Sequence, residues 1–225
     1  MKDIHQAIDC CSDDTTITGE GIVADYATSM REDAFAVSNE EKKVRIALLF
    51  KEIMEVIGLD LSDDSLRGTP ERVAKMYIEE IFSGLDPANK PASTLFSNTY
   101  AYNQMLIEKN ITLYSYCEHH FVPIMGRVHV AYISSGKVIG LSKLNRIVQY
   151  FGRRPQVQER LTNQIGAELS AVLDTDDVAV IVEAKHLCVC SRGVADDASS
   201  TTTVYYGGRF RAADKIAELH NYVFR

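Results

Sequence analysis

The sequence contains no tryptophan, and its aromatic residues are 11 Tyr and 8 Phe in a chain of 225 residues. A core built from this chain must therefore be mainly aliphatic. No apolar run approaches the roughly 18–20 residues that a helix needs to cross a bilayer, so no transmembrane helix is expected. No apolar stretch follows Met1, Lys2 and Asp3 either, so we expect no secretory signal peptide.

Cysteine is also scarce, with five residues in all: Cys10, Cys11, Cys117, Cys188 and Cys190. Five is an odd number, and the spacing does not suggest a disulfide scaffold. Together with the missing signal peptide, this indicates a reducing compartment, the cytoplasm. Cysteines in that compartment serve as buried apolar residues, as metal ligands or as nucleophiles.

The net charge of −7 is unevenly distributed. Residues 1–45 are acidic, whereas residues 134–160 contain a single acid, Glu159, among six lysines and arginines. Such a basic run is usually a solvated helix face, and the alternative is a local pocket for an anionic ligand. An acidic chain, with pI near 5.4, does not favour general nucleic-acid binding.

The chain divides into three parts. Residues 1–37 lack any sustained period and predict a flexible acidic arm. Residues 38–100 form a helical region, in which Ser38 with Glu41 makes a capping-box pattern and Thr69 is a candidate N-cap before Pro70. Residues 101–225 hold the remaining elements, including a last helix over about 212–223.

Hydrophobic patterning in the third part predicts two pairs of strands around two helices. The first pair covers 111–116 and 126–133, and β-branched runs predict the second pair at 178–189 and 201–206. Between the pairs, Ser142 caps one predicted helix and Pro155 opens the next. The fold class is α+β, with the order β-β-α-α-β-β after an N-terminal helical region.

Three residues form a candidate metal site. Cys117 and His120 are three apart, so one turn can direct a thiolate and an imidazole at one ion. Zinc accepts such mixed ligands, and Cys188 would complete a Cys₂His set with a fourth position open to water, as in catalytic zinc sites. The bland alternative is that these cysteines only pack in the core.

Cys190 is a rival ligand. If 186–190 is a strand, residues 186, 188 and 190 share one face, but alternate residues lie roughly 6.5–7 Å apart, which makes joint ligation awkward. We therefore expect one thiolate from this segment, with Cys190 in the core. His119 and His186 add imidazoles beside the ligands, and a zinc-activated water near an imidazole is a hydrolytic centre.

Polar residues in the basic region indicate how a nucleotide could bind. A carboxylate such as Glu159, after Gln158, can accept the two parallel donors of guanine, although a first-turn acid commonly just stabilises its helix dipole. Lys143, Arg146 and Arg192 are suited to phosphate, unless each is only a solvated surface residue.

Taken in order, these motifs resemble GTP cyclohydrolase I over about residues 40–210. The matching segments are 69–76 (TPERVAKM), 80–85 (EIFSGL), 117–123 (CEHHFVP), 138–146 (VIGLSKLNR), 154–162 (RPQVQERLT), His186-x-Cys188, 192–194 (RGV), Ser199-x-Thr201-x-Thr203 and Gly208-x-Phe210. Tyr116, where a smaller residue is common, and the unusual Cys190 depart from the pattern without replacing a motif position.

The resemblance implies a tunnelling fold (T-fold). In that fold a four-stranded antiparallel sheet carries two helices on one side, five subunits close a barrel-like ring, and two pentamers stack into a homodecamer with active sites at subunit interfaces. Ring closure would also remove the exposed edges of the sheet. No nucleic-acid or membrane partner is implied.

The resemblance also implies conversion of GTP and water to 7,8-dihydroneopterin triphosphate and formate. It assigns zinc to Cys117, His120 and Cys188, protonation of the purine imidazole ring to His119, and proton transfer near C8 to His186. Ser142 would lie near the ribose during its rearrangement, and Gln158 and Glu159 would hold guanine. The triphosphate would be bound by Lys143, Arg146, Arg192 and Arg72, with Arg72 reaching in from a neighbouring subunit.

Two other function classes remain at this point. A non-enzymatic zinc module would use four protein ligands, Cys190 included, and would not turn over GTP. Another T-fold enzyme, such as a pterin synthase or a nitrile reductase, would act on a different substrate. The run 117–120 with the Gln158-Glu159 pair and the lysine and arginine set favours GTP.

Overall fold

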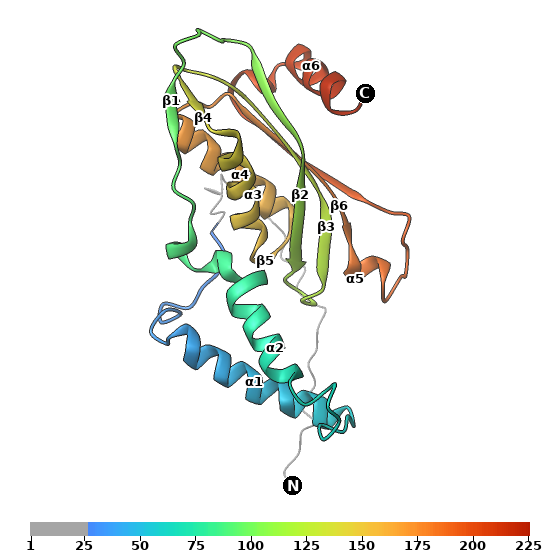
Figure 1. Cartoon of the computed structure of the whole chain (residues 1–225). Helices are drawn as coiled ribbons and strands as arrows, with labels where there is room; N and C mark the ends of the chain where they lie inside the picture. The colour runs from blue at the N-terminus through green and yellow to red at the C-terminus, as the bar shows by residue number, and fades with distance from the viewer. Residues whose placement is uncertain (1–26) are drawn as a thin grey trace, which may run out of the picture.

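A twisted antiparallel sheet forms the centre of the molecule, as the computed structural model shows for residues 27–225 (Figure 1). Its four main strands lie in the order β2 (Met105–Cys117), β3 (Pro123–Ile133), β6 (Val178–His186) and β7 (Thr201–Tyr206). The two-residue strand β5 (Pro155–Gln156) pairs parallel with β2 at one edge. The short strands β1 (Leu95–Ser97) and β4 (Lys137–Ile139) form a separate antiparallel pair.

Two helices, α3 (Leu141–Gly152) and α4 (Gln158–Leu173), lie side by side on one face of this sheet (Figure 1). Their apolar stripes pack on Val128, Val130 and the alternating valines of β6, and all of these residues are buried. The expected order β-β-α-α-β-β is thus confirmed for the central elements. The expected helix starts are wrong, because Gly140 and not Ser142 is the N-cap of α3, and Pro155 lies in β5 before α4 begins at Gln158. The mainly aliphatic core is confirmed as well, because this cluster is dominated by Val, Ile and Leu.

The opposite face of the sheet is covered near the C-terminus by α6 (Ala213–Val223). Leu219 of this helix and Phe210, which precedes it, pack on Ile133 and Ile181. Because β6 is covered on both faces, residues 178–182 are all buried, which explains why that strand reads as an uninterrupted apolar run.

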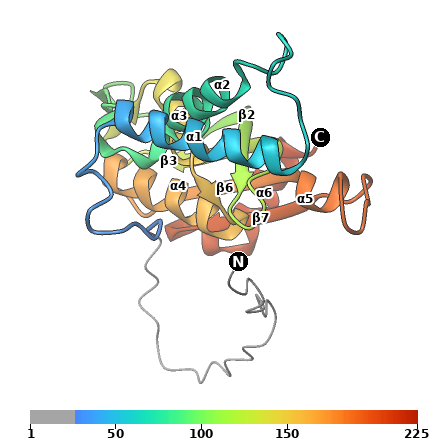
Figure 2. The same ribbon diagram turned by 90° about the horizontal axis from the view of Figure 1, so that it is seen from below.

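The N-terminal helices lie below the sheet in Figure 1, and Figure 2 shows α1 crossing this end of the molecule. Helix α1 (Asn39–Val56) begins after Ser38, whose Oγ accepts a hydrogen bond from Glu41 N at 3.2 Å, as expected. Helix α2 (Thr69–Lys75) starts one residue earlier than expected, because Gly68 and not Thr69 occupies the cap position. A π-helical turn, η1 (Met76–Ile81), and two 3₁₀ turns, η2 (Ser83–Leu85) and η3 (Pro87–Asn89), complete this region.

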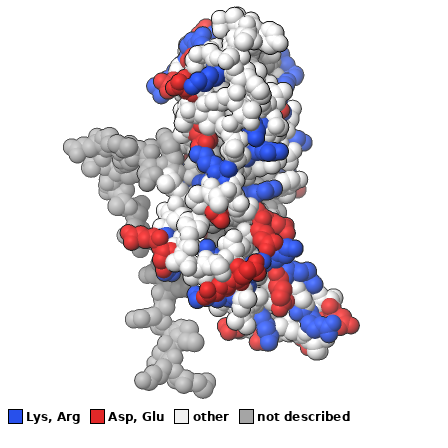
Figure 3. All heavy atoms as spheres, turned by 60° about the vertical axis from the view of Figure 1, so that its left-hand side comes forward, with Lys and Arg blue, Asp and Glu red and all other residues white. Residues whose placement is uncertain are grey.

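Charges of both signs are interspersed over the lower part of the molecule in Figure 3, where these helices lie. Lys43 of α1, for example, pairs with Glu40 at 2.7 Å and with Glu79 of η1 at 2.5 Å. Such pairs join the N-terminal elements to one another at the solvent-exposed surface.

Residues 1–26, which include most of the predicted acidic arm as well as Cys10 and Cys11, lie outside the described part of the chain. The remainder of the predicted arm, residues 27–37, contacts α4 and the segment before it. There, Thr28 Oγ1 lies 3.4 Å from Arg154 Nη1 and 3.4 Å from Gln164 Nε2. Among residues 27–225, no helix has the length and hydropathy needed to span a bilayer.

Candidate metal and substrate site

Strand direction brings the two halves of the candidate metal site together. β2 and β6 both pair antiparallel with β3, so they run parallel to each other, and their C-terminal ends lie at the same end of the sheet (Figure 1). Cys117 is the last residue of β2, and His186 is the last residue of β6. Residues far apart in the sequence therefore lie close together at this end of the sheet.

The turn after β2 holds the histidines outside the sheet. Cys117 N donates to Val122 O at 2.9 Å, and Phe121 N donates to Cys117 O at 2.8 Å, which closes the chain into a tight loop. Phe121 has a φ of 53°, in the left-handed region that side chains rarely adopt, and its ring packs on Phe82 at 5.1 Å between centroids. Cys117 is buried, whereas His119 and His120 are exposed.

Cys117, His120 and Cys188 offer one ligand atom each, and these atoms all lie within 4.8 Å of one another. The Cys117 sulfur lies 4.0 Å from His120 Nδ1. Zinc–sulfur bonds of about 2.3 Å and zinc–nitrogen bonds of about 2.0 Å in tetrahedral geometry require neighbouring ligand atoms roughly 3.5–4 Å apart. The donor set and its spacing therefore fit zinc with a small contraction.

The strand expected through residue 189 is wrong at its end. β6 stops at His186, and residues 187–190 form the single helical turn α5 (Leu187–Cys190). Residues two apart on a helix are rotated by roughly 200°, so Cys188 and Cys190 point to different sides. Cys188 joins the metal-binding group of the described residues and Cys190 does not, although the reason differs from the strand spacing that predicted it. The expectation that Cys190 lies in the core is wrong, because its side chain is half-buried.

Burial and the adjacent Cys117 thiol raise the pKa of the Cys188 thiol above its ordinary value. Metal binding requires thiolates, so an ion at this site must displace the protons of both cysteines. Both cysteines are free of disulfides in the structure.

His186 and Gln158 form a hydrogen-bonded pair beside this group, with 2.7 Å between His186 Nε2 and Gln158 Oε1. The Gln158 side chain is buried, and its Nε2 donates to Val182 O, Thr201 O and Thr203 Oγ1 at 2.9–3.1 Å. Since the two carbonyls can only accept, the amide orientation is fixed and Oε1 must accept from His186 Nε2. Burial lowers the pKa of His186, and the nearby Glu159 charge opposes this shift with a smaller effect.

Glu159 is exposed at the N-terminus of α4, where Gln158 is buried. Two consecutive helical residues are about 100° apart, so one faces the sheet and the next faces outward. The first-turn N–H groups of this helix have no partner within the helix. The described chain thus presents a carboxylate and main-chain donors side by side, next to His186.

Among residues 27–225, Arg192 is the only predicted triphosphate ligand that contacts this group, and its Nη1 lies 3.1 Å from His120 Nε2. Since an arginine has only donors, His120 Nε2 accepts this bond and the proton of the neutral ring resides on Nδ1.

The other predicted phosphate and ribose residues lie elsewhere in the chain. Ser142, Lys143 and Arg146 are in the first half of α3, next to β4, and the last residue of that helix, Gly152, packs on β2 at Tyr114. Arg146 lines a separate cavity of about 240 Å³ with Gln149, Tyr150 and Arg153.

Arg72 occupies a third place, on α2, where its Nη2 donates to Ser65 O at 2.9 Å and to Thr69 Oγ1 at 2.8 Å. Within one chain the structure therefore brings together the residues from 117–120, 158–159, 186–188 and 192, but it does not bring Ser142, Lys143, Arg146 or Arg72 to them.

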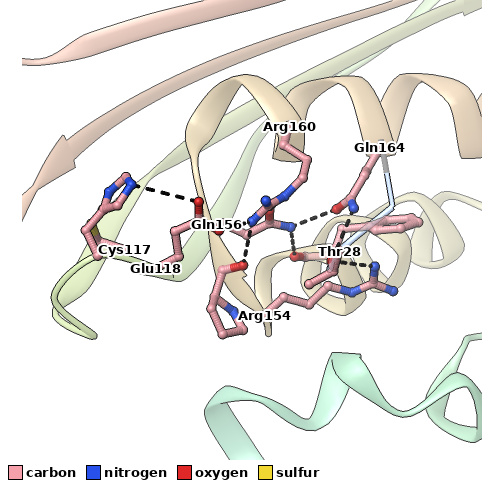
Figure 4. A network of polar contacts seen from close by, with 10 residues as sticks. Thr28, Cys117, Glu118, Arg154, Gln156, Arg160 and Gln164 are labelled. Atoms are coloured by element: carbon pink, nitrogen blue, oxygen red, sulfur yellow. Dashed lines mark hydrogen bonds and ion pairs between the residues drawn. The ribbon is translucent and has the colours of Figure 1, made fainter. Parts of the chain in front are cut away.

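Sequence reasoning missed one pair at the site, Glu118 and Arg160. Arg160 belongs to the basic run and Glu118 to the metal motif, and their side chains form an ion pair (Figure 4). The only signal in the sequence was the opposite charge of the two residues, which does not identify a partner 42 positions away.

Comparisons with known proteins agree on one family. The model of the family GTP cyclohydrolase I matches residues 46–223. A protein of Flavobacterium johnsoniae named GTP cyclohydrolase 1 is 56% identical over 194 residues, which cover 86% of this chain and 87% of that protein. Proteins of the same name from Aliivibrio fischeri and Vibrio parahaemolyticus are 55% and 54% identical, over 82% and 86% of this chain and 84% and 89% of their own lengths.

Proposed function

The chain belongs to the GTP cyclohydrolase I family, and we propose that Cys117, His120 and Cys188 hold a zinc ion for its reaction. The reaction converts GTP to 7,8-dihydroneopterin triphosphate and formate, the first step of pterin synthesis. The observation that carries the proposal is the convergence of these three ligand atoms within 4.8 Å. Three protein ligands leave one coordination position open, the pattern of catalytic zinc.

Zinc bound there would act as a Lewis acid and would lower the pKa of a coordinated water to about 7. The chain contributes the two thiolates and the imidazole. Binding through His120 Nδ1, the nitrogen nearer to Cys117, requires the ring proton to move to Nε2. Nε2 then no longer accepts from Arg192, and the guanidinium becomes available for a phosphate oxygen.

His119 is the proposed proton donor to the imidazole ring of the purine. Its side chain is 64% exposed, so it can reach a substrate that lies over the metal. Its Nε2 lies 3.9 Å from a carboxylate oxygen of Glu118. His119 is not among the three converging ligands, in keeping with a role in proton transfer.

Glu159 is the proposed reader of guanine. Guanine presents N1–H and its 2-amino group side by side, and a carboxylate can accept both. Gln158 would contribute through its main-chain N–H at the start of α4, because its side chain is committed to His186 and to β6 and β7. His186, held by Gln158, would assist proton transfer near C8.

The second half of the site is proposed to come from neighbouring subunits. Ser142 and Lys143 lie at one end of α3, whereas the metal-binding group lies beyond its other end, and a twelve-residue helix is about 18 Å long. If these residues, Arg146 and Arg72 bind the ribose and triphosphate of the same GTP, different copies of the chain must supply them.

Apolar surface on α1 also supports assembly. Four apolar residues at helical spacing are 52–87% exposed in one chain: Val44, Leu48, Ile53 and Val56. Covering this stripe and the free edge of β7 favours the ring of five subunits and the stacked homodecamer that the family resemblance implies. The cytoplasm is the proposed compartment, because zinc binding by Cys117 and Cys188 needs reduced thiols.

The direct test is incubation of the zinc-loaded protein with GTP. Formate release, together with a pterin fluorescence signal after oxidation, is expected in proportion to bound zinc. A zinc content near one ion per chain that persists in Cys190→Ala but not in Cys188→Ala would support the open three-ligand site. Zinc held equally by both variants would exclude the proposed ligand set.

A further inference from the structure

The ion pair between Glu118 and Arg160 has a position that a surface pair lacks. Glu118 lies between Cys117, a proposed metal ligand, and His119, the proposed proton donor (Figure 4). Arg160 lies in the first turn of α4, and its side chain is only 17% exposed. The pair therefore joins the turn after β2 to a helix of the core.

The Arg160 guanidinium also forms hydrogen bonds with groups other than Glu118. Its Nε donates to Gln156 Oε1 at 3.0 Å, and its Nη2 donates to Pro155 O at 3.0 Å. Gln156 is fully buried, and its Nε2 donates to Phe151 O at 2.9 Å and to Gln164 Oε1 at 2.8 Å (Figure 4). These contacts fix the orientation of the guanidinium, so that it faces Glu118.

The backbone of the turn is attached at the same place. Cys117 is in register with Gln156 in the parallel pairing of β2 and β5, and Glu118 N donates to Gln156 O at 3.1 Å. The second carboxylate oxygen of Glu118 lies 3.9 Å from His119 Nε2. Gln156, Arg160, Glu118 and His119 therefore form a continuous series of polar contacts from the core to the site.

An ordinary stabilising role would not need this arrangement. Exposed pairs such as Arg45 with Glu41 on α1 contribute little, because water screens both charges. Glu118 is not one of the converging metal ligands, and Arg160 contacts none of them. Polar groups that surround metal ligands without binding the metal commonly set ligand orientation and metal affinity.

We propose that Arg160 is a positioning residue that acts through Glu118 to hold the turn 117–120 in the orientation needed for metal binding. The inference rests on the proposed metal role of Cys117, His120 and Cys188. Arg160 touches neither metal nor substrate; it restrains the carboxylate that neighbours a ligand on one side and His119 on the other.

Cobalt binding gives the test a readout that does not depend on turnover. Thiolate-to-cobalt absorption reports ligand geometry, and competition with a chromophoric chelator gives the affinities for Co²⁺ and Zn²⁺. In Arg160→Met we expect both affinities to fall about 10- to 100-fold with a changed cobalt spectrum. Arg160→Lys should recover part of this loss, since it keeps the charge and loses the fork to Gln156 and Pro155.

Arg45→Met is the matched control, because it also removes an arginine from an ion pair but far from the site, and it should leave both affinities unchanged. If Arg160→Met does not fold, Glu118→Gln replaces it: this variant keeps the size and loses the charge, and it should lower both affinities in the same direction. Combining the two substitutions should cost no more than the larger single loss, because Arg160 acts through Glu118.

Two failures are distinguishable. A wild-type protein without thiolate-to-cobalt absorption would overturn the proposed metal site itself. A wild-type protein with that absorption, and Arg160→Met or Glu118→Gln variants with unchanged spectrum and affinity, would overturn only the positioning role of Arg160.

Discussion

Gln158 and Glu159 are adjacent in the chain and have opposite surroundings. The Gln158 side chain is 1% exposed and all of its polar atoms have partners within the fold. Glu159 is exposed, and its side chain forms no hydrogen bond or ion pair within residues 27–225. Of the two side chains, Glu159 is the one whose hydrogen-bonding capacity is free for a ligand.

Replacing Glu159 by Gln should reduce kcat/KM for GTP by at least about 10-fold, because a hydrogen bond to a charged group contributes about 1.5–3 kcal/mol. Steady-state kinetics, zinc content and thermal unfolding would be measured on one preparation, and the last two should be unchanged. Unaltered kinetics with a slightly lower unfolding temperature would instead mean that Glu159 only stabilises its helix terminus, an effect of about 0.3–1 kcal/mol.

His119→Ala should keep zinc and lose formate release by about 10²–10⁴-fold, because it removes a proton donor and not a ligand. Zinc content by atomic absorption and formate release under the same conditions separate the two effects. Near-native formate release would exclude His119 from proton transfer, and loss of zinc would make it a ligand.

His129 gives a pH dependence away from the site. Its side chain is 4% exposed, and burial lowers its pKa below the ordinary 6.5, while Glu183 on β6 opposes this and Lys109 on β2 and Arg127 on β3 reinforce it. The unfolded chain then binds the proton more readily than the folded one. The free energy of unfolding should therefore fall as pH drops below about 6.5, by at most about 1.4 kcal/mol per pH unit.

The measurement is urea unfolding of wild type and His129→Gln from about pH 7.5 to 5.5 at one protein concentration. The variant should have the flatter profile, since its side chain does not titrate. His220→Gln, at an exposed position, should keep the wild-type slope. Identical slopes for wild type and His129→Gln would contradict the assignment to His129.

Single residues differ in how well the sequence predicted them. Cys117, His120 and Cys188 were predicted as a ligand set because their chemistry is specific and their motif is local, and the structure brings them together. Arg160 and Arg154 looked like members of a solvated basic run. Arg154 instead donates to Gly84 O at 2.8 Å and stacks over Tyr150, contacts that depend on the folded chain and leave no local pattern.

Among the elements, boundaries set by local hydrogen bonds were predictable. The start of α1 depends on the Ser38 side chain, as the sequence predicted, and Gly58, whose φ is 89°, follows its end. The helix α5 was not, because Val189 and the preceding valines favour a strand. Strand pairing ends there because Ile124 is the partner of His186 and only Pro123, which has no N–H to donate, precedes it in β3.

The geometry of α5 gives a sharp comparison between two cysteines of one element. Cys188→Ala should lose zinc, whereas Cys190→Ala should retain about one zinc per chain, because only the first sulfur joins Cys117 and His120. Both substitutions remove one thiol from the same four-residue helix, so each controls for the other. Equal zinc loss in the two variants would show that Cys190 also binds the metal.

For the whole molecule, the feature that the sequence could not reveal is the exposed stripe of α1. Helical spacing correctly predicted an amphipathic helix, but in one chain only Met54 of this helix is buried. Periodicity identifies an apolar face and does not say whether the same chain or another copy covers it. In the proposed assembly, another copy of the chain would cover Val44, Leu48 and Ile53.

Leu48→Gln should shift the protein to smaller species and lower GTP turnover, since Leu48 is 60% exposed in one chain and would be buried between chains. Light scattering after size-exclusion chromatography gives the mass. Asp64→Asn, at an exposed position outside α1, is the control and should keep the wild-type mass. An unchanged mass for Leu48→Gln would remove this face from the interface.

The position of the C-terminal ends of β2 and β6 at one end of the sheet has a consequence for biosynthesis. Cys117 and Cys188 are separated by roughly 70 residues, so at about 5–20 residues per second the second thiol is made several seconds after the first. A nascent chain therefore carries Cys117 with His120 but cannot close the metal-binding group until β6 has emerged and paired with β3. Metal acquisition would thus follow translation and mark a completed sheet, unlike small zinc modules, in which the ion itself drives folding.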